Sequence, residues 1–418
     1  MKLLYIIFIK LYPFIAQIIS VKNDKAKLWI DGRKNIFQRL ENTFSNNQSP
    51  VVWVHCASLG EFEQGRPIIE SIKKNYSSHK ILLTFFSPSG YEIRKNYPLA
   101  DWVFYLPMDG KKAAKRFVHI VDPKLIFFVK YEFWFFYLKE AKRQSIPTLL
   151  ISANFRANQP FFKWYGSFYR SMLASFTHVF VQNATSKKLL ESIGFTNNVV
   201  TIHGDTRFDR VIENAAHFSE IPLINSFLNH SKQVIVAGST WLQDDVLLAE
   251  FAAKNKEIYF IIAPHSVEKS RIENCKLLYQ QAITFTELQE QKTTTTNVLI
   301  IDNVGMLSNL YKYATICYVG GGFTKDGIHN VLEAAVYGKP VIIGPNYKKY
   351  TEAVELVAAD GVISIKNALE LEHQIQELLN DLNKYQQVCK QAQQYVLQKA
   401  GATKIVDEYI YENRLLTK

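Results

Sequence analysis

The sequence predicts an α/β protein with two parallel sheets, each covered by helices, and an apolar helix at the N-terminus. At 418 residues the chain is longer than one hydrophobic core usually holds, so two domains of about 200 residues each are expected. Apolar runs of strand length alternate with longer helical stretches in both halves, a pattern typical of parallel sheets. The N-terminal segment, residues 1–21, is almost entirely apolar.

The strands and helices follow one another in two series. In the first series strands are expected at residues 51–57, 81–86, 125–129, 148–152 and 179–182, with a helix at 61–75. In the second, strands are expected at 233–237, 258–263, 314–319 and 340–343, with helices at 244–255 and 329–338. A last helical stretch, 382–411, breaks at Gly401 and could return to the first domain. The expected domains are therefore 1–21 for the membrane helix, then 22–215 and 216–418.

Residues 1–21, MKLLYIIFIKLYPFIAQIISV, have about the length that crosses a bilayer. The basic residues that follow would keep the rest of the chain cytoplasmic by the positive-inside rule: Lys22, Lys25, Lys27, Arg33 and Lys34. Lys10 and Gln17 share one helical face, and Pro13 interrupts the middle, as in a helix that lies in the membrane interface. We predict membrane attachment, either spanning or interfacial.

The composition and motifs of the chain limit the classes of ligand that it is expected to bind. Basic residues exceed acidic ones by 49 − 38 = 11, which favours an anionic partner. No RNP, KH or helix-turn-helix signature is present, so no nucleic acid is expected. The four cysteines are far apart, and neither a CxxC nor an HExxH motif occurs, so we expect a reducing compartment and no metal.

Residues 314–345 indicate an anion site. A buried strand leads into Gly320-Gly321-Gly322, and the predicted helix follows. Glycine allows close approach of the backbone to a ligand, and a helix N-terminus favours phosphate. Asn330 and Glu333 lie on one face of its first turn, where a carboxylate could accept two hydrogen bonds from a ribose diol. This is how nucleotide-sugar glycosyltransferases hold their donor; alternatively, the two residues only cap a helix.

The segment VHCASLGE, residues 54–61, carries the second candidate. The strand ends near Ser58, turns at Gly60 and opens a helix with Glu61, whose ionised form the helix dipole stabilises. Such a carboxylate can accept a proton from a sugar hydroxyl as a general base. An ordinary first-turn glutamate would be favoured for the same electrostatic reason.

Residues 155–170 are rich in aromatic and basic side chains, including Arg156, Trp164 and Arg170. On one helix they could insert into a membrane interface or hold an acylated acceptor. Packing in the core is the alternative, and it must hold for several of the aromatic residues.

Seven short motifs follow one another along the chain: Ser58-Leu59-Gly60-Glu61, Val121-Asp122-Pro123-Lys124, Glu132-Phe133-Trp134, Gly204-Asp205-Thr206-Arg207-Phe208-Asp209, Gly238-Ser239-Thr240, Val319-Gly320-Gly321 and His329-Asn330-Val331-Leu332-Glu333-Ala334. In this order they resemble the 3-deoxy-D-manno-octulosonic acid (Kdo) transferases of lipopolysaccharide assembly, over nearly the whole chain. The resemblance implies a GT-B fold, in which two Rossmann-like domains face a cleft. It also implies an inverting glycosyltransferase that uses no metal or other cofactor.

The same resemblance implies CMP-Kdo as donor substrate and a lipid A precursor of the lipid IVA type as acceptor. The reaction would take place at the cytoplasmic face of the inner membrane, whose anionic surface is a further expected partner.

The resemblance also assigns roles to individual residues. Glu61 matches the general base, and Ser58, Gly60 and Arg156 are expected to contact the acceptor. The expected CMP-Kdo contacts are Ser239, Thr240, Pro264, His265, Val304, Gly305, Met306, Asn330, Val331, Leu332 and Glu333.

Four positions depart from the family pattern. Lys130-Tyr131-Glu132 stands where a Glu-x-Glu pair is usual, so Lys130 and Glu132 are both candidates for a catalytic role. Arg207 replaces a stabilising lysine, which keeps the charge but changes its geometry. Pro264-His265-Ser266 replaces Pro-Arg-His, and Met306 replaces an acidic residue.

Two functions of other classes also fit parts of the sequence. A soluble sugar-nucleotide epimerase or hydrolase would share the GT-B fold but would not need residues 1–21. A non-catalytic, membrane-bound nucleotide-sugar sensor would keep Glu333 and tolerate the loss of Glu61.

Overall fold

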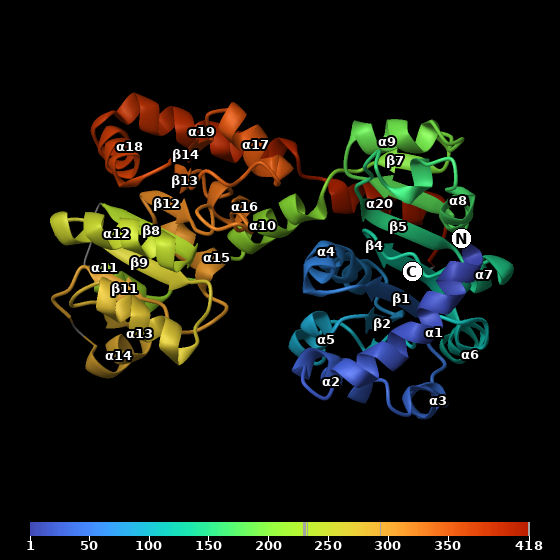
Figure 1. Cartoon of the computed structure of the whole chain (residues 1–418). Helices are drawn as coiled ribbons and strands as arrows, with labels where there is room; N and C mark the ends of the chain where they lie inside the picture. Colours follow the sequence, from blue (N-terminus) through green and yellow to red (C-terminus); the bar gives the residue numbers. More distant parts are fainter. Residues whose placement is uncertain (229–230, 232, 293, 417–418) are drawn as a thin grey trace. The chain divides into compact units, whose positions relative to one another are not determined.

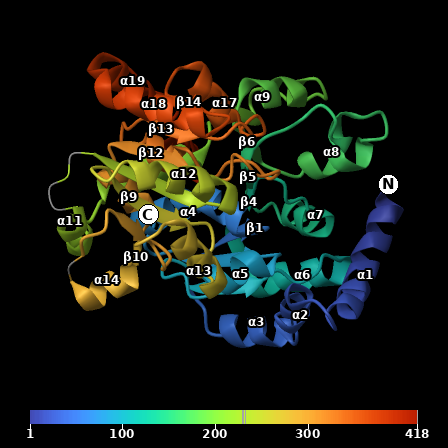
Figure 2. The ribbon, with the colours of Figure 1, turned by 60° about the vertical axis from the view of Figure 1, so that its left-hand side comes forward.

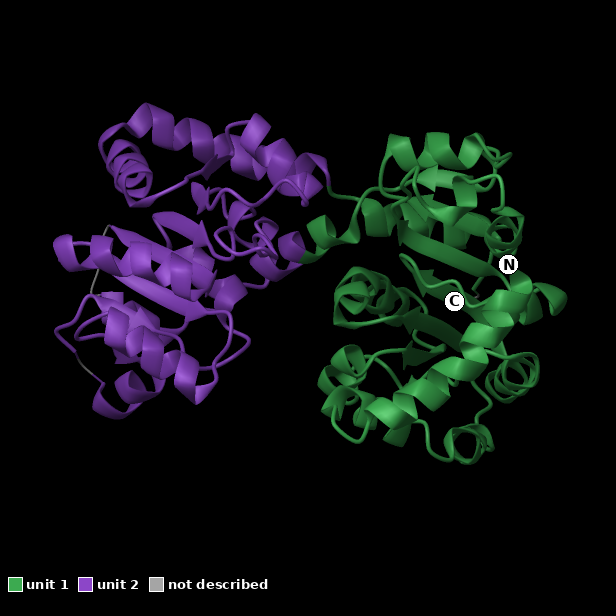
Figure 3. Ribbon diagram, in the orientation of Figure 1, with its two compact units in different colours: residues 1–210, 400–418 green, residues 211–399 purple. Residues whose placement is uncertain are grey.

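The computed structural model describes residues 1–228, 231, 233–292 and 294–416. The chain divides into two compact units (Figure 3). Unit 1 comprises Met1–Arg210 and Ala400–Lys418, and unit 2 comprises Val211–Lys399. Among the described residues, each unit contains one seven-stranded sheet, and the strand pairs within both sheets are parallel (Figure 1). The predicted α/β class with two parallel sheets and an N-terminal apolar helix is confirmed.

The sheet of unit 1 has the order β3-β2-β1-β4-β5-β6-β7. Its strands are β1 (Val51–Cys56), β2 (Lys80–Phe85), β3 (Trp102–Tyr105), β4 (Pro123–Val129), β5 (Thr148–Ala153), β6 (His178–Val181) and β7 (Val200–Ile202). Every residue of β1 is buried, as expected for a central strand covered by helices on both faces.

The helices of unit 1 cover both faces of this sheet and build two core clusters. They are α1 (Lys2–Ile19), α2 (Asp24–Asp31), α3 (Ile36–Phe44), α4 (Leu59–Asn75), α5 (Pro88–Arg94), α6 (Lys111–Val121), α7 (Phe135–Arg143), η1 (Pro160–Phe162), α8 (Ser167–Leu173), α9 (Ala184–Glu191) and α20 (Ala402–Glu412). Helix α10 (Thr206–Ala216) leads from unit 1 into unit 2.

Helix α20 returns the end of the chain to unit 1. Its Val406 and Ile410 are fully buried in the same cluster as residues of β1, β2 and β4. Asp209, in the first turn of α10, accepts hydrogen bonds from the backbone N–H groups of Gly401 (2.5 Å) and Thr403 (2.6 Å). Gly401 has φ +106°, a left-handed conformation that glycine adopts at little cost, and there the chain turns between α19 (Leu382–Gln398) and α20.

Unit 2 has the strand order β10-β11-β9-β8-β12-β13-β14. Its strands are β8 (Val234–Thr240), β9 (Tyr259–Pro264), β10 (Ile283–Thr284), β11 (Val298–Ile300), β12 (Ile316–Val319), β13 (Val341–Ile343) and β14 (Val362–Ser364). Besides α19, its helices are α11 (Pro222–Leu228), α12 (Leu242–Lys254), α13 (Lys269–Leu278), α14 (Phe285–Gln291), α15 (Leu307–Leu310), η2 (Tyr311–Tyr313), α16 (Leu332–Ala335), α17 (Thr351–Ala358) and α18 (Ala368–Asn380).

One predicted helix is much shorter in the structure. Helix α16 covers only Leu332–Ala335 of the expected 329–338. The preceding residues belong to the glycine loop, because the N–H of His329 donates to the carbonyl of Gly320 at 3.1 Å. The argument from the dipole of a long helix therefore does not apply at this position.

The sequence suggested that the aromatic segment at residues 155–170 is one helix, but it is not. It forms η1, a loop and the start of α8. Phe155 and Phe161 are buried in the core, whereas Trp164 is 92% exposed. Core packing thus explains part of this segment, and the single exposed tryptophan is left on the surface.

Helix α1 packs along the outside of unit 1, beside α2 (Figures 1 and 2). The packed side chains recur at helical spacing: Tyr5, Ile9, Tyr12 and Ala16. The Tyr5 hydroxyl donates to the buried Asp109 carboxylate at 2.5 Å, and the Phe135 N–H donates to the same hydroxyl at 3.2 Å. The opposite face of α1 is apolar and exposed.

Among the described residues, α1 is the one helix that is long and apolar enough to cross a membrane. A signal sequence has the same length and composition.

Candidate functional site

The residues that the sequence singled out lie at one edge of each sheet. In unit 1 they follow the carboxyl ends of β1, β4, β5 and β7, and in unit 2 they follow those of β8, β9, β11 and β12. Ligands of open parallel sheets bind at this edge, because the loops there begin the crossovers to the helices. Each unit therefore contains its own cluster of candidate residues.

Glu61 lies in the first turn of α4, next to the end of β1. Ser58 is the N-cap residue in extended conformation, and its hydroxyl donates to the Glu61 carboxylate instead of capping a backbone N–H. The Glu61 side chain is thereby held at the helix start. Glu61 is half-buried, so the carboxylate remains reachable.

Gly60 is exposed, and packing does not explain why it is a glycine. A Cβ atom added there would meet only the Ser58 hydroxyl, at an ordinary 3.9 Å. Its backbone φ is not positive. The space beside the Gly60 Cα atom is therefore open.

The carboxylate of Glu132 is held by two aromatic side chains. Trp134 follows two residues later in the same loop, and His55 lies in β1. The indole N–H of Trp134 donates to Glu132 at 2.5 Å, and His55 Nε2 lies 3.2 Å from the same oxygen. The Thr84 hydroxyl accepts from Trp53 at 2.7 Å and lies 2.9 Å from His55 Nδ1. If that hydroxyl donates to Nδ1, the proton of a neutral His55 sits on Nε2 and faces Glu132.

Lys130 directly follows β4 and has φ +66°, an uncommon conformation for a residue with a side chain. Its ammonium group lies 5.5 Å from the centre of the Tyr131 ring. Burial raises the pKa of Tyr131, with the charges of Arg156 and Glu61 acting in opposite directions on it. The effects of both charges on Tyr131 indicate that the loop after β4 lies near Glu61 and Arg156.

Arg207 forms a two-point ion pair with Asp205. Its Nε and Nη2 atoms lie 2.9 and 2.8 Å from the same carboxylate oxygen, and its backbone N–H donates to the other oxygen at 2.9 Å. Gln182 adds a donor to Asp205 at 3.1 Å. The guanidinium is thus fixed in one orientation, which suits a residue that meets a charge in a defined place.

In unit 2, Asp244 joins the start of α12 to the glycine loop. Its buried carboxylate accepts from the N–H groups of Trp241 and Gly321 at 2.8 and 2.9 Å and from the Tyr318 hydroxyl at 2.7 Å. Burial raises the pKa of Asp244 although these hydrogen bonds oppose the shift. This residue fixes where the loop passes over the end of the sheet.

The three glycines of that loop are required by packing against protein backbone. A Cβ atom at Gly320 would meet the Ser239 carbonyl at 2.4 Å, one at Gly321 the Gly327 carbonyl at 2.5 Å, and one at Gly322 the Gly344 nitrogen at 2.5 Å. Packing within the protein therefore accounts for the three glycines, and the approach of a ligand to this loop stays a prediction.

The end of β8 nevertheless has the marks of a binding position. Ser239 has φ +53°, and the hydroxyl of the neighbouring, fully buried Thr240 has no hydrogen-bond partner among the described residues. A buried hydroxyl without a partner loses about 1–3 kcal/mol. A ligand oxygen at this strand end would remove that penalty.

Three aromatic rings stack beside Thr240. The rings of Trp241 and His265 are parallel, with centroids 4.6 Å apart, and His329 lies 4.5 Å from His265. The Trp241 N–H points to His329 Nε2 at 3.2 Å. Burial, with the nearby Arg271 charge, lowers the pKa of His265, and burial lowers the pKa of His329 to about 4. The lowered pKa values favour the neutral form of both imidazoles at pH 7.

Asn330 and Glu333 come together as expected from their spacing. The Asn330 amide donates to Glu333 at 3.0 Å and accepts from the Leu332 N–H at 3.2 Å. Both side chains are half-buried. Val331 and Leu332 are buried in the core, so only their backbone is available to a ligand.

The remaining expected donor contacts lie on two loops. Pro264 is buried at the end of β9. Val304 is exposed, Gly305 has φ +97°, and Met306 is the N-cap residue of α15. Within the described residues, no three His, Cys, Asp or Glu side chains gather as metal ligands would.

Sequence reasoning missed His55, Trp241 and Asp244. Each of them lies within five residues of a strand end that the sequence had already indicated. This proximity is the signal by which they could have been predicted. Their roles depend on partners 77 or more residues away, as for His55 with Glu132 and Asp244 with Gly321.

A family model described as 3-deoxy-D-manno-octulosonic-acid transferase (kdotransferase) matches residues 34–210. A 3-deoxy-D-manno-octulosonic acid transferase of Rickettsia bellii is 26% identical, with 100% of this chain and 99% of the relative covered. A bifunctional glycosyltransferase/methyltransferase of Fusobacterium nucleatum is also 26% identical over 84% of this chain, which spans 56% of that relative's length.

Among solved structures, the UDP-GlcNAc 2-epimerase of Neisseria meningitidis has the same fold, with a TM-score of 0.61 and 18% identity over 87% of this chain and 100% of that one. The family model over residues 34–210 and the 3-deoxy-D-manno-octulosonic acid transferases matched over 78–99% of their own length support a Kdo-transferring glycosyltransferase.

Proposed function

We propose that this protein transfers Kdo from CMP-Kdo to a lipid A precursor of the lipid IVA type, with inversion at the anomeric carbon and Glu61 as general base. The observation that carries the proposal is the position of Glu61 in a Kdo transferase chain: a half-buried carboxylate at a helix start, bonded to Ser58 and beside the open space at Gly60.

In this mechanism the acceptor hydroxyl oxygen attacks the anomeric carbon of Kdo. The new carbon–oxygen bond forms while the hydroxyl proton passes to Glu61, and the bond from the anomeric carbon to the phosphate oxygen breaks. CMP then leaves with the electron pair as an anion. General-base catalysis is needed because a sugar hydroxyl has a pKa far above 7.

We assign charge stabilisation to Arg207 and Lys130, with no metal or other cofactor. Arg207 is oriented by its two-point pair with Asp205. Glu132, held by His55 and Trp134, positions the loop that carries Lys130. The acceptor lies against Ser58, Gly60 and Arg156 in this proposal.

We assign the donor to the strand-end cluster of unit 2. Glu333, steadied by Asn330, would accept hydrogen bonds from the ribose hydroxyls, and the Thr240 hydroxyl would bond a ligand oxygen. His265 would meet the phosphate and become charged on binding. The turn at Gly305 and the backbone of Val331 and Leu332 would complete the contacts to CMP.

Membrane attachment completes the proposal. Helix α1 is docked through Tyr5 and Tyr12 along its length, so we place its exposed face in the interface of the cytoplasmic leaflet of the inner membrane. Charged substitutions on that face, Leu4→Lys with Leu11→Lys and Ile18→Lys, should move the folded protein from the membrane to the soluble fraction. Retention of the triple variant on membranes would refute this attachment.

The direct test of function is to incubate the membrane fraction with CMP-Kdo and lipid IVA and to measure the mass of the lipid product by mass spectrometry. A mass increase by one or more Kdo units is expected. Free Kdo with an unchanged lipid would indicate a hydrolase, and binding of CMP-Kdo without turnover would indicate a sensor; either result would overturn the proposal.

A further inference from the structure

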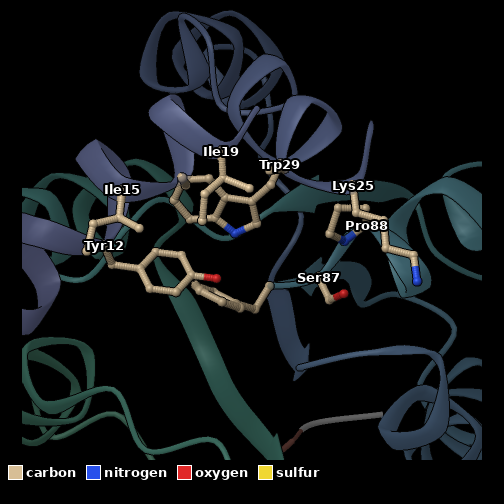
Figure 4. Close-up of a pocket in the computed structure, with 10 residues that line it drawn as sticks. Tyr12, Ile15, Ile19, Lys25, Trp29, Ser87 and Pro88 are labelled. Carbon is tan, nitrogen blue, oxygen red and sulfur yellow. The ribbon is translucent and has the colours of Figure 1, made fainter. Parts of the chain in front are cut away.

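Unit 1 contains a cavity of about 280 Å³ between α1, α2 and the loop that follows β2 (Figure 4). Its α1 wall is formed by Tyr12 and by three aliphatic residues, Ile15, Ala16 and Ile19. Trp29 and Lys25 come from α2, and Ser87 comes from the loop. This volume is at the low end for ligand pockets. It suits part of one hydrocarbon chain better than a whole sugar nucleotide.

The indole of Trp29 provides the first sign of a ligand. Its side chain is 5% exposed, and its Nε1 atom has no hydrogen-bond partner among the residues that the structure describes. Figure 4 shows this nitrogen on the side of the ring that faces the space between Tyr12 and Ser87. A buried N–H without an acceptor is rare, so an acceptor oxygen is expected in the pocket.

The surroundings of Trp29 are otherwise satisfied. The Arg33 guanidinium lies 4.0 Å from the centre of the Trp29 ring and donates to the carbonyl oxygens of Phe86, Leu106 and Trp29 at 2.9, 2.9 and 3.2 Å. Tyr12 and Phe86 pack edge-on or tilted against the indole, with centroids 5.2 and 5.7 Å away. The indole is thus fixed in place, and its unpaired N–H is a built feature of the pocket.

Charge and location indicate the class of ligand. Residues 1–40 contain 8 Lys and Arg and 2 Asp, an excess of 8 − 2 = 6, and Lys25 stands at the rim of the pocket. The neighbouring face of α1 exposes Phe14, Ile15 and Ile18, among other large apolar side chains. An apolar pocket beside an apolar surface, with an ammonium group at its rim, suits an anionic amphiphile.

The pocket also adjoins the segment that carries the candidate base. The Ser87 N–H donates to the Ala57 carbonyl at 2.8 Å, and the Phe86 N–H donates to the Cys56 carbonyl at 3.3 Å. A Cβ atom at Gly90, in the first turn of α5, would lie 3.0 Å from the Ser58 carbonyl carbon. The wall of the pocket and the Ser58–Glu61 turn are therefore packed directly against each other.

We propose that this pocket binds one ester- or amide-linked acyl chain of the acceptor glycolipid. The chain lies along Ile15, Ala16 and Ile19, its carbonyl oxygen accepts from Trp29 Nε1, and a phosphate of the same lipid pairs with Lys25. This assignment deepens the proposed function, because it names where the lipid part of the acceptor is held.

The test uses the full-length protein in mixed micelles with two acceptors, the acylated glycolipid and its deacylated counterpart. Ala16→Phe fills the pocket, and Ala174→Phe, at an exposed alanine just after α8, is the matched control. We expect Ala16→Phe to raise the KM for the acylated acceptor at least tenfold and to leave the deacylated acceptor and CMP binding unchanged. Trp29→Phe keeps the ring and removes one neutral hydrogen bond, so a two- to tenfold rise is expected.

Thermal melting shows whether the variants fold. If Ala16→Phe does not fold, Trp29→Phe still tests the proposal. Equal KM values for wild type and both variants would overturn the pocket while leaving Kdo transfer intact. A binding assay without turnover separates the two proposals: labelled acylated acceptor should bind the wild type and lose affinity in Ala16→Phe. Equally tight competition by phosphatidylglycerol would show that a bilayer lipid occupies the pocket, which would also overturn the proposal.

Discussion

The two strand–loop–helix junctions that the sequence singled out are built in opposite ways. In unit 1, Gly60 stands in open space in the first turn of a 17-residue helix, and the Ser58 hydroxyl beside it donates to the carboxylate of Glu61. In unit 2, Gly320, Gly321 and Gly322 are pressed against backbone, the helix that follows has four residues, and Glu333 is held by Asn330. The single glycine leaves more room for a ligand than the glycine triplet.

This difference teaches that a glycine-rich loop is not by itself evidence of a ligand site. A glycine is required either by a close protein neighbour or by a ligand, and only the structure distinguishes the two. In unit 2 the better evidence is the unpaired hydroxyl of Thr240 and the ring stack of Trp241, His265 and His329. The two junctions therefore predict different consequences of mutation.

The largest effect is expected at Glu61. Glu61→Gln keeps the size of the side chain but cannot accept the acceptor proton, so transfer should fall by at least about a hundredfold. Folding and CMP binding should stay near those of the wild type. Glu63→Gln, two residues along the same helix, is the matched control. Near wild-type turnover of a folded Glu61→Gln enzyme would leave Glu61 as an ordinary helix-start residue.

A smaller but clear loss is expected at Glu333. A hydrogen bond to a charged group contributes about 1.5–3 kcal/mol, so Glu333→Ala should weaken CMP binding at least tenfold. Calorimetry measures the affinity, and a melting curve verifies that the variant folds. The exposed Glu290 provides a control variant, Glu290→Ala. Wild-type affinity in folded Glu333→Ala would remove the ribose assignment and leave Glu333 as a partner of Asn330 only.

A third, several-fold effect concerns pH. The pKa of His265 is lowered in the free protein, and a bound phosphate would raise it, so binding takes up a proton. The affinity of wild type relative to His265→Asn should therefore rise as the pH falls from 8 towards 6. The ratio cancels the titration of the ligand's own phosphate. The neighbouring His329, with a pKa of about 4, stays neutral over this range. A ratio independent of pH would exclude His265 from the phosphate contact.

The smallest effect concerns the return of the chain to unit 1. Asp209→Asn removes a charged acceptor from the N–H groups of Gly401 and Thr403 and should lower the unfolding free energy of α20 by about 1–2 kcal/mol. Faster amide exchange in α20, with little change in the helices of unit 2, is the expected signature. Unchanged protection of α20 would show that Val406 and Ile410 hold the helix without this cap.

Much of the fold could be predicted from local patterns. The central strands β1, β4, β8 and β12 each contain an unbroken apolar run of four or five residues, and such runs identify buried parallel strands without any knowledge of their partners. The apolar character of α1 was equally plain. The helix at 329–338 was predicted too long, because the N–H of its first residue, His329, bonds to Gly320 in the preceding loop and the helix begins only at Leu332.

The sequence by itself determined the α/β class, the strand ends at which Glu61 and Thr240 stand, and the apolar helix at residues 2–19, because these depend on the order of neighbouring residues. Tertiary structure alone decided which side of α1 docks on unit 1, that His55 and Trp134 hold Glu132, and that the glycine triplet serves packing. Each of these depends at least in part on groups that the chain brings together from distant positions, such as His55 with Glu132 and Gly320 with Ser239, and no local pattern records such a contact.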